Sequence, residues 1–415
     1  MREVTLADIT LSITDGKHGD CEDQSNSGYY FISCKDVKDG QIIYCQARQI
    51  TEKDFLDTHK RTKLEPNDIL ITNSGTIGRM AFIQDKAETS RTTFQKSVAI
   101  LKPDTSQVLP KYLYYQLQSC VNCFVNQANG SAQKNLLLST MRAFKLNIQK
   151  DFSVQQRVAD ILSAYDDLIE NNQKQIKLLE EAAQRLYKEW FVDLRFPGHE
   201  TTPIVDGVPE GWKVKSVAEC LAFHGNGGWG KETPTGKYTH AGKVMRGTDM
   251  PDIRAGQFGD VPLRYHTDVD VQKRVLMRND LVFELSNGNI DNIGRCLLID
   301  DMILQACGKN MICASFCKLL RPIDQLHAIM LYFEIQDMQS SGRMLPLKKH
   351  GSNGINNFDF EGFLSHRFVI PANARYILTL TSILSKISVL RNQLFCLREA
   401  RDRLLPKLMS GEVEV

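Results

Sequence analysis

The chain has 415 residues, which is long enough for two domains with substantial cores and connecting helices. Its formal net charge of +2 excludes a uniformly basic protein, so any face that binds nucleic acid must be local. The 11 cysteines are odd in number and scattered, Met1-Arg2-Glu3-Val4 does not lead into a signal-peptide apolar region, and no run approaches the ~18 apolar residues of a membrane span. We therefore expect a soluble, reduced, cytoplasmic protein without membrane contact.

Residues 1–150 are predicted to form a first globular domain of short strands and turns. Apolar runs mark three strands; the turn signal Asn73-Ser74-Gly75 separates the first two, and Pro103 ends the third. The predicted elements are strands over 68–72, 79–83 and 98–101 and a short helix over 110–127.

A long helix is predicted over residues 151–195, ending around Trp190-Phe191. Its core positions recur every heptad from Leu162 for about four heptads, which favours a coiled-coil seam over a chance amphipathic helix. The Pro- and Gly-rich stretch 196–212 predicts a linker to the next domain.

Residues 213–372 are predicted to form a second domain that repeats the first. An apolar run over 280–283, a polar loop over 286–289 and a partner strand over 295–299 follow the earlier scheme. Strands outnumber crossover helices, so each domain is predicted to be an α/β globule of the α+β class. A second long helix with a heptad period is predicted over 373–415.

The two long helices are expected to pack on each other, antiparallel if the globules lie at opposite ends. Two positions in the apolar seams are polar, Asn172 and Arg401; they are either tolerated near a surface or fix the register of the pair. The predicted apolar seam residues are Leu162, Ile169, Ile176, Leu179, Leu186, Ile383, Leu390, Leu394, Leu397 and Leu404.

The order of landmarks in the first half recurs in the second half. The offsets between matching landmarks stay within 212–222 residues, which indicates a duplicated unit. Such a pseudo-two-fold chain suits a target with two half-sites. The matches include Asn67-Asp68 with Asn279-Asp280, Gly78-Arg79 with Gly294-Arg295, Lys102-Pro103 with Arg321-Pro322, and Gly130-Ser131 with Gly351-Ser352.

The segments around the long helices resemble the specificity subunits of type I restriction-modification systems. The resemblance covers the whole chain in architecture and is most specific in the two helices. Its motifs are the segment 156–163, Leu179-Glu180-Glu181, Trp190-Phe191-Val192-Asp193 with Phe196-Pro197, Pro209-Glu210-Gly211-Trp212, and the segment 403–412. The first domain departs from the pattern, because Met1-Arg2-Glu3-Val4 lacks a Pro-x-Gly-Trp entry of its own.

The resemblance implies a non-catalytic, DNA-reading subunit of a larger assembly. Each target-recognition domain would read one half of a split double-stranded DNA sequence, and the antiparallel helices would act as a ruler between them. Two modification subunits, which are adenine methyltransferases using S-adenosylmethionine, would dock on the helices. Restriction subunits that use ATP and Mg²⁺ would join outside them. The resemblance implies no cofactor bound by this chain itself.

Base contacts need polar and basic side chains on loops that enter a groove, so the duplicated loops supply the candidates. For each one the alternative is an ordinary solvated turn. The candidates in the first domain are Lys17, His18, Asn73, Ser74, Thr76, Arg91, Ser131, Gln133, Lys134 and Asn135. Those in the second domain are Asn226, Trp229, Lys231, Ser286, Asn287, Asn289, Lys348, Lys349, His350, Ser352 and Asn353.

The apparent catalytic motifs do not hold. Gly225–Lys231 has phosphate-loop spacing, but Glu232 stands where Ser or Thr would hold magnesium. Cys120 and Cys123 have no second pair and are expected to be buried structural thiols, as are Cys307, Cys313 and Cys317. No histidine pair has metal-ligand spacing, and no Asn-Pro-Pro-aromatic motif of an adenine methyltransferase occurs.

The sequence thus predicts neither a catalytic site nor a metal site. The function it predicts is the recognition of a bipartite DNA target. The rival hypothesis is a coiled-coil scaffold whose two domains bind other proteins. A DNA reader would bind with a steep salt dependence, and a scaffold would not.

Overall fold

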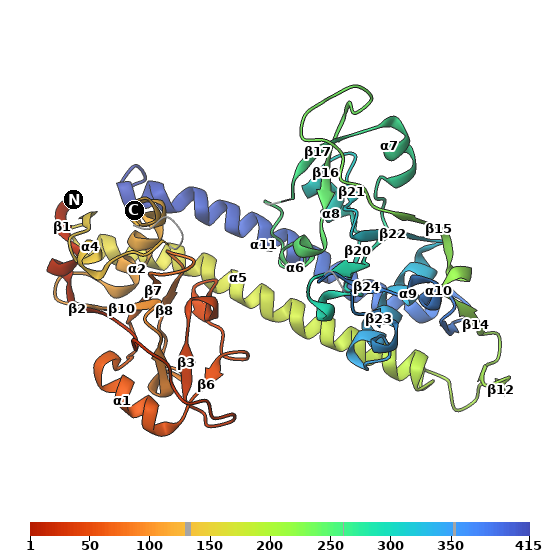
Figure 1. Ribbon diagram of the computed structural model, residues 1–415, viewed down its shortest axis with the longest axis horizontal. Helices are drawn as coiled ribbons and strands as arrows, with labels where there is room; N and C mark the ends of the chain where they lie inside the picture. The colour runs from red at the N-terminus through yellow and green to blue at the C-terminus, as the bar shows by residue number, and fades with distance from the viewer. Residues whose placement is uncertain (129–133, 260, 352–353) are drawn as a thin grey trace. The chain divides into compact units, whose positions relative to one another are not determined.

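The computed structural model describes residues 1–128, 134–259, 261–351 and 354–415, which form two units (Figure 1). Unit 1 comprises Met1–Asp167 and Glu399–Val415, and unit 2 comprises Leu168–Arg398. The boundaries fall inside both long helices, so each helix contributes one segment to each unit. Among the described residues, no helix is both long and apolar enough to span a membrane.

Unit 1 is built on a four-stranded antiparallel sheet in the order β2-β10-β7-β8. A three-stranded sheet, β6-β3-β9, and the pair β1-β11 complete its main strands. The strands are β1 (Arg2–Thr5), β2 (Thr10–Asp15), β3 (Tyr30–Ile32), β4 (Val37–Lys38), β5 (Gln41–Ile42), β6 (Arg48–Gln49), β7 (Ile69–Thr72), β8 (Met80–Phe82), β9 (Thr92–Phe94), β10 (Val98–Pro103) and β11 (Lys145–Ile148). The short helices are α1 (Glu52–Thr62), α2 (Pro110–Ser119), α3 (Val121–Gln127) and α4 (Leu138–Arg142).

The three strands predicted in the first domain are confirmed, and β7 and β8 are partners. The single helix predicted over 110–127 is wrong, because the chain breaks at Cys120 into α2 and α3. The break turns α3 so that the Phe124 ring is fully buried, with its centroid 4.4 Å from that of Phe144.

Unit 2 repeats these sheets as β15-β22-β18-β20, β17-β16-β21 and β14-β25. Its strands are β12 (Ile204–Val205), β13 (Val208–Pro209), β14 (Lys213–Ser216), β15 (Leu221–Asn226), β16 (His240–Met245), β17 (Leu263–His266), β18 (Leu281–Glu284), β19 (Ser286–Asn287), β20 (Cys296–Leu298), β21 (Ile312–Cys313), β22 (Cys317–Pro322), β23 (Lys348–Lys349), β24 (Asn356–Phe358) and β25 (Arg367–Ile370). Its short helices are α6 (Met250–Arg254), α7 (Asp268–Arg274), α8 (Asp301–Cys307), α9 (Gln325–Ser340) and α10 (Phe360–Leu364). The two units therefore share one topology, as the internal repeat predicted.

The repeated residues hold equivalent positions in this topology. An ion pair joins Lys102 Nζ to Asp68 Oδ2 at 2.8 Å in unit 1, and Arg321 Nη2 to Asp280 Oδ2 at 2.7 Å in unit 2. Both carboxylates are buried just before a central strand, where a paired cation offsets the desolvation of the charge. The internal repeat thus preserves this buried ion pair beside the central strand of each unit.

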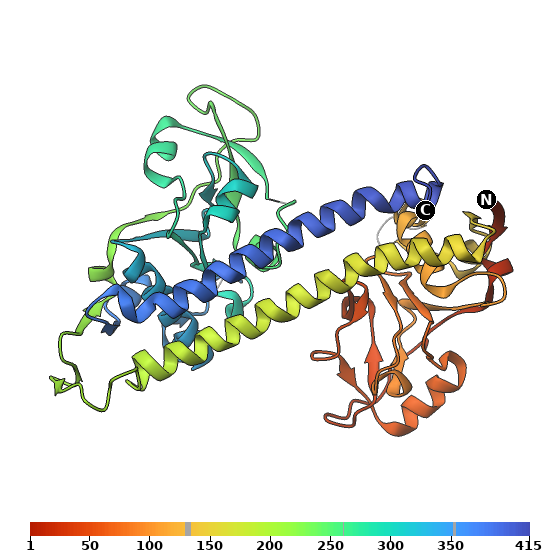
Figure 2. The same ribbon diagram turned by 180° about the vertical axis from the view of Figure 1, so that it is seen from behind.

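The long helices are α5 (Phe152–Tyr187), which continues as a π-helical turn over Lys188–Val192, and α11 (Leu378–Ser410). They lie side by side and antiparallel in each unit (Figures 1 and 2). In unit 1, Arg157 donates to the Val415 carbonyl at 2.8 Å, and Arg401 pairs with Asp166 at 2.8 Å. The beginning of α5 therefore lies beside the end of α11, as in an antiparallel pair.

In unit 2 the facing sides of α5 and α11 form an apolar cluster. Asn172 interrupts it, is only 6% exposed, and donates from Nδ2 to Gln393 Oε1 at 3.2 Å. Its position is therefore not a tolerated surface site. The cluster contains Ile169, Ile176, Ile387, Leu390 and Leu394, with Leu179, Ile383 and Leu397 packed at its margin. The other seam candidates serve domain cores: Leu162 and Leu404 pack in unit 1, and Leu186 packs in unit 2.

Candidate nucleic-acid interface

In both units, the candidate loops cluster at one edge of the four-stranded sheet. Because neighbouring strands are antiparallel, the ends of β2 and β7 meet the beginnings of β10 and β8 at that edge. The corresponding edge of unit 2 holds the ends of β15 and β18. The fold thus brings together loops that are distant in the sequence.

The first loop of unit 1 leaves β2 through Gly16. A Cβ at Gly16 would lie 2.0 Å from the Phe94 carbonyl oxygen, so this close backbone approach requires glycine. Lys17 then donates its backbone N–H to Phe94 O at 2.8 Å, while its Nζ lies 3.2 Å from Asp54 Oδ1. The His18 ring is exposed and contacts Asp15 Oδ2 at 3.0 Å. The loop is firmly placed, but the Lys17 charge is already partly balanced.

The second loop of unit 1 follows β7 and contacts the chain around Asn135. Asn73 accepts from the backbone N–H of Leu136 at 2.8 Å, and Ser74 forms an isolated bridge with Asn135. Asn73 is only 8% exposed, so its side chain does not lie at the surface. The exposed candidates here are Thr76, Lys134 and Asn135; Ser131 and Gln133 lie outside the described residues.

Arg91 is not brought to this edge. It is exposed and precedes β9, whereas the opposite end of β9, at Phe94, contacts the Lys17 loop. Thr92 and Thr93 are fully buried. Thr92 and Thr93 therefore belong to the core of the three-stranded sheet. Arg91 lies at the end of β9 away from the Lys17 loop, and its contact with DNA stays a prediction.

The first loop of unit 2 carries exposed aromatic and basic side chains. The Arg264 guanidinium lies 4.9 Å from the Trp229 ring centroid, and the Lys231 ammonium lies 5.8 Å from that of Tyr238. Arg264 also pairs with Glu232 at 3.2 Å. Trp229 remains 41% exposed. Stacked cations and aromatic faces of this kind suit contacts with phosphates and bases.

The second loop of unit 2 is part of a small sheet, β19-β24-β23. This sheet brings together two segments with candidate DNA-binding residues, Ser286-Asn287 and Lys348-Lys349, by pairing both with β24. Ser286 Oγ donates to Asn357 Oδ1 at 2.8 Å. The same relation links Ser74 to Asn135 in unit 1. Ser352 and Asn353 lie outside the described residues.

The basic residues of this small sheet are held by neighbouring groups. Lys348 Nζ donates to the Ile290 carbonyl at 3.1 Å, and burial lowers the pKa of this amine. Lys349 pairs with Asp359 at 2.9 Å, and His350 Nδ1 lies 3.2 Å from Asn356 Oδ1. These contacts fix the position of the positive groups on the loop.

The polar residues Asn287 and Asn289 support the loop from within. Asn287 Oδ1 accepts the backbone N–H of Asn289 at 2.8 Å, and Asn289 Oδ1 accepts that of Asp291 at 3.0 Å. Asn289 and Asn226 are exposed, whereas Asn287 is half-buried. Asn289 and Asn226 thus lie at the surface.

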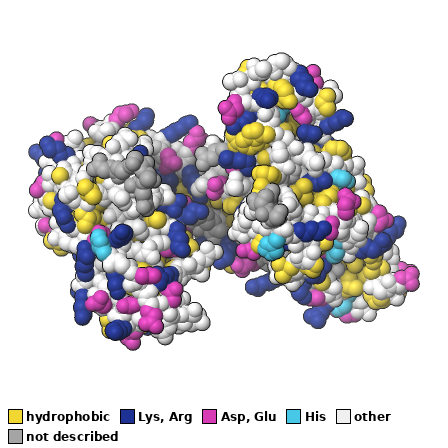
Figure 3. All heavy atoms as spheres, viewed as in Figure 1, with side chains coloured by type: hydrophobic (Ala, Val, Ile, Leu, Met, Phe, Trp, Pro, Cys, Tyr) yellow, Lys and Arg dark blue, Asp and Glu magenta, His cyan; other side chains and the backbone are white. Residues whose placement is uncertain are grey.

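Basic and acidic side chains are interspersed on the faces shown in Figure 3, as the near-zero net charge implies. The difference between the units is local. The charged residues of the first loop are Lys17, Asp20, Glu22 and Asp23 in unit 1, and Lys231, Glu232 and Lys237 in unit 2. The two edges therefore present different electrostatic surfaces on equivalent frames.

Arg48 and Arg264 support the first loops, and the sequence analysis missed both. Arg48 on β6 pairs with Asp20 and Asp23, and Arg264 holds the same place on β17. Their separation of 216 residues equals that of Gly78 and Gly294. An alignment extended beyond the chosen landmarks would have found this pair.

The cysteines are all free thiols. Cys307, Cys313 and Cys317 are buried, as expected, and burial raises the pKa of Cys313 to about 12. The expected burial is wrong for Cys123, which is exposed on α3. In the described parts of the chain, no three His, Cys, Asp or Glu side chains form a group suited to a metal ion.

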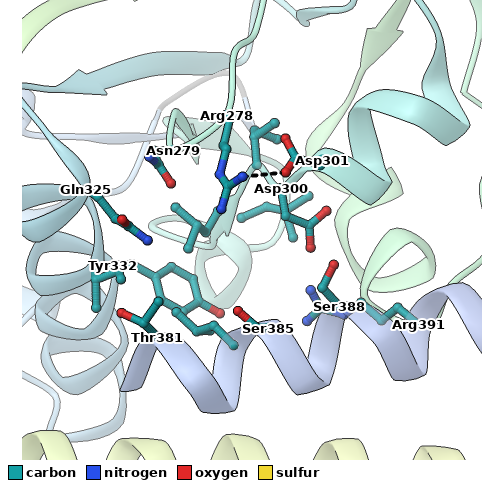
Figure 4. Close-up of a pocket in the computed structure, with 15 residues that line it drawn as sticks. Arg278, Asn279, Asp300, Asp301, Gln325, Tyr332, Thr381, Ser385, Ser388 and Arg391 are labelled. Carbon is teal, nitrogen blue, oxygen red and sulfur yellow. Dashed lines mark hydrogen bonds and ion pairs between the residues drawn. The ribbon is translucent and has the colours of Figure 1, made fainter. Parts of the chain in front are cut away.

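A cavity of about 180 Å³ lies elsewhere in unit 2, lined by residues of β20, α9 and α11 (Figure 4). Arg278 Nη1 contacts Asp301 Oδ2 at 2.6 Å, and Arg391 Nη2 contacts Glu180 Oε1 at 3.1 Å. The cavity includes Asn279, which precedes β18 and is therefore distant from the loop after it. Both arginines are therefore paired within the protein.

The structure thus has two α+β units with corresponding sheets, and each long helix contributes a segment to both. Residues 14–181 match the family described as the type I restriction modification DNA specificity domain. The match covers most of unit 1 and the greater part of α5.

Two relatives and a solved structure are similar to this chain. The chain is 31% identical over 199 residues to the type I restriction enzyme MjaIX specificity subunit of Methanocaldococcus jannaschii, covering 46% of this chain and 44% of the relative. It is 25% identical over 198 residues to the HindI specificity subunit of Haemophilus influenzae, covering 46% and 41%. These matches span less than half the length of either relative.

The fold is similar to the crystal structure of the type I restriction-modification S subunit from M. genitalium. The TM-score is 0.54 at 13% identity, and the similarity covers 98% of this chain and 95% of that one. At this identity the similarity concerns the fold.

Proposed function

We propose that this chain is the non-catalytic specificity subunit of a type I restriction-modification complex, and that it reads a bipartite DNA target. The proposal rests on the edge of the four-stranded sheet at which the candidate loops lie, because this edge occurs in both units. Each unit places an equivalent pair of loops on an equivalent sheet, while the side chains on those loops differ. Equivalent frames with different side chains suit two different half-sites.

Recognition would rest on short polar side chains that reach base edges, with basic groups on the phosphates. The exposed amides Asn226 and Asn289 have donors and acceptors matched to adenine. Trp229 and Lys231 would hold the backbone beside them. Because both units belong to one chain, binding at one half-site raises the effective concentration of the other.

The net charge of +2 predicts weak DNA binding by the isolated chain, since phosphate neutralisation supplies much of such affinity. We therefore propose that two modification subunits clamp the DNA and methylate adenine with S-adenosylmethionine. Restriction subunits that use ATP and Mg²⁺ would complete the assembly in the cytoplasm. The proposal assigns catalysis and these cofactors to the partners.

The test is a map of methylated adenines in DNA from cells that express this chain with its cognate modification subunit. We expect one split motif that disappears when this chain is omitted. An assembled, competent complex without such a motif would instead favour a scaffold whose domains bind proteins.

A further inference from the structure

The loop after β7 in unit 1 and the loop after β18 in unit 2 are closed by the same pair of backbone hydrogen bonds. In unit 1, the N–H of Thr72 donates to Arg79 O at 2.8 Å, and the N–H of Gly78 donates to Thr72 O at 2.9 Å. In unit 2, the N–H of Glu284 donates to Arg295 O at 2.9 Å, and the N–H of Gly294 donates to Glu284 O at 2.9 Å. The two loops are thus anchored identically.

What lies between the anchors differs. The loop of unit 1 spans 73–78, and that of unit 2 spans 285–294, four residues more. The extra length in unit 2 includes β19 and a 3₁₀ turn over Ile290–Asn292. A constant frame around a variable loop is the arrangement expected where two half-sites are read differently.

A buried carboxylate supports the longer loop. Glu284 is 2% exposed and lies at the end of β18. Its Oε2 accepts from Arg295 Nε at 2.8 Å, and its Oε1 accepts from Asn287 Nδ2 at 2.7 Å. The carboxylate also packs against Gly247. A Cβ at that position would lie 2.1 Å from Oε1, so only glycine fits there.

Asn287 transmits this support along the loop. While its Nδ2 binds Glu284, its Oδ1 accepts from the backbone of Asn289 at 2.8 Å and from Asn292 Nδ2 at 3.3 Å. One buried charge is therefore linked through one amide to the exposed Asn289. A bidentate base contact requires that such an amide be held in one orientation.

In unit 1, a single side chain supports the shorter loop in a similar way. Thr72 occupies the position of Glu284, 212 residues earlier. Its Oγ1 donates to the Thr76 carbonyl at 2.5 Å and accepts from the backbone N–H of Arg79 at 2.9 Å. A hydroxyl reaches across the short loop, whereas the longer loop needs a carboxylate and two partners.

We infer that Glu284 and Thr72 are positioning residues for base recognition, each fixing the loop that reads one half-site. The inference rests on the proposed function and deepens it. Neither side chain touches DNA; each acts through the loop that it holds. Each residue therefore governs the specificity of one half-site and leaves the other unchanged.

The test maps methylated adenines with the full chain and its cognate modification subunit, comparing the unaltered chain with Glu284→Gln. The amide cannot accept from both Arg295 and Asn287, so the loop loses one anchor. We expect discrimination at one half-site to fall by about ten-fold, the scale of one good base contact. The other half-site should be read as before, and Thr72→Val should give the reciprocal result.

Asp280→Asn is the matched control, because it breaks an equally buried carboxylate–arginine pair before the same strand, away from the loop. It should leave both half-sites intact. If Glu284→Gln does not assemble, Asn287→Ala tests the same link from the loop side.

Unchanged recognition by both loop variants, or equal relaxation by Asp280→Asn, would overturn the inference while leaving the proposed function in place. The absence of any split motif with the unaltered chain would overturn both.

Discussion

At the residue scale, Glu334 on α9 is a buried carboxylate with three different hydrogen-bond donors. It is 2% exposed and accepts from Tyr187 at 2.7 Å, His366 at 2.8 Å and Arg343 at 2.9 Å. Burial by itself would raise the pKa of this carboxyl, but the three donors outweigh it and lower the pKa below the usual 4.5. The ionised form is therefore the one that the fold stabilises.

We expect Glu334→Gln to lower the free energy of unfolding by about 1.5–3 kcal/mol at pH 7, the range for hydrogen bonds to a charged group. A depressed pKa contributes stability above the unfolded-state value and loses it as pH falls through the folded value. The difference between the variant and the unaltered chain should therefore shrink from pH 4.5 downward. Urea unfolding followed by circular dichroism at several pH values measures it.

Glu361→Gln, which changes an exposed carboxylate on α10, is the control and should have little effect. A Glu334→Gln deficit that stays constant into acid would mean that packing, and not ionisation, makes the contribution.

The candidate residues could be predicted in part. Polar turns with a duplicated counterpart identified the segments of Ser74, Asn135, Ser286 and Lys348. Ser74 pairs with Asn135, and the strands of Ser286 and Lys348 both pair with β24. Burial within a turn leaves no sequence signal, so Asn73 could not be distinguished from its exposed neighbours. Glu284 was missed because a buried acid at a strand end looks like the start of a polar loop.

At the element scale, the central strands were predictable because they are short apolar runs bounded by turn residues. β7 and β18 are buried along their whole lengths, as such runs require. The sheet β19-β24-β23 was not predictable. Its strands are two or three residues long, and β19 pairs with β24 across about seventy positions, as Ser286 does with Asn357. No local pattern encodes that contact.

The helix pair in unit 2 gives an element-scale prediction at Asn172. We expect Asn172→Leu to raise the free energy of unfolding by about 1–2 kcal/mol, because it buries an apolar side chain and exposed Gln393 can turn to water. Asn172→Ala should lower it by about 1 kcal/mol by removing the hydrogen bond and leaving a void. Chemical denaturation of the full chain measures both.

A loss of stability in Asn172→Leu would show that the amide contributes more than one hydrogen bond to the pairing of α5 and α11. That result would favour a role for Asn172 in fixing the register of the helices.

At the scale of the whole molecule, both long helices extend through both units, so the proposed function gives them the role of a ruler. A helix rises ~1.5 Å per residue and a duplex ~3.4 Å per base pair, so one added turn corresponds to about two base pairs. Inserting four residues after Gln173, with a matching four after Asn392, should lengthen the unread spacer and preserve both half-sites.

The insertion keeps Asn172 opposite Gln393. Methylation mapping gives the spacer directly. A four-residue insertion after Gln173 alone, without its partner, is the control and should impair assembly. An unchanged spacer with the paired insertion would contradict the ruler.

The shared helices also determine the order in which the protein can mature on the ribosome. Leu408 and Met409 of α11 are buried in the core of unit 1 together with Leu6 and Ile9, although all of unit 2 is synthesised between them. The unit that begins first is therefore completed last. Until α11 emerges, nascent unit 1 lacks two of its core side chains, so we expect a chain that terminates before α11 to leave apolar surface of unit 1 exposed.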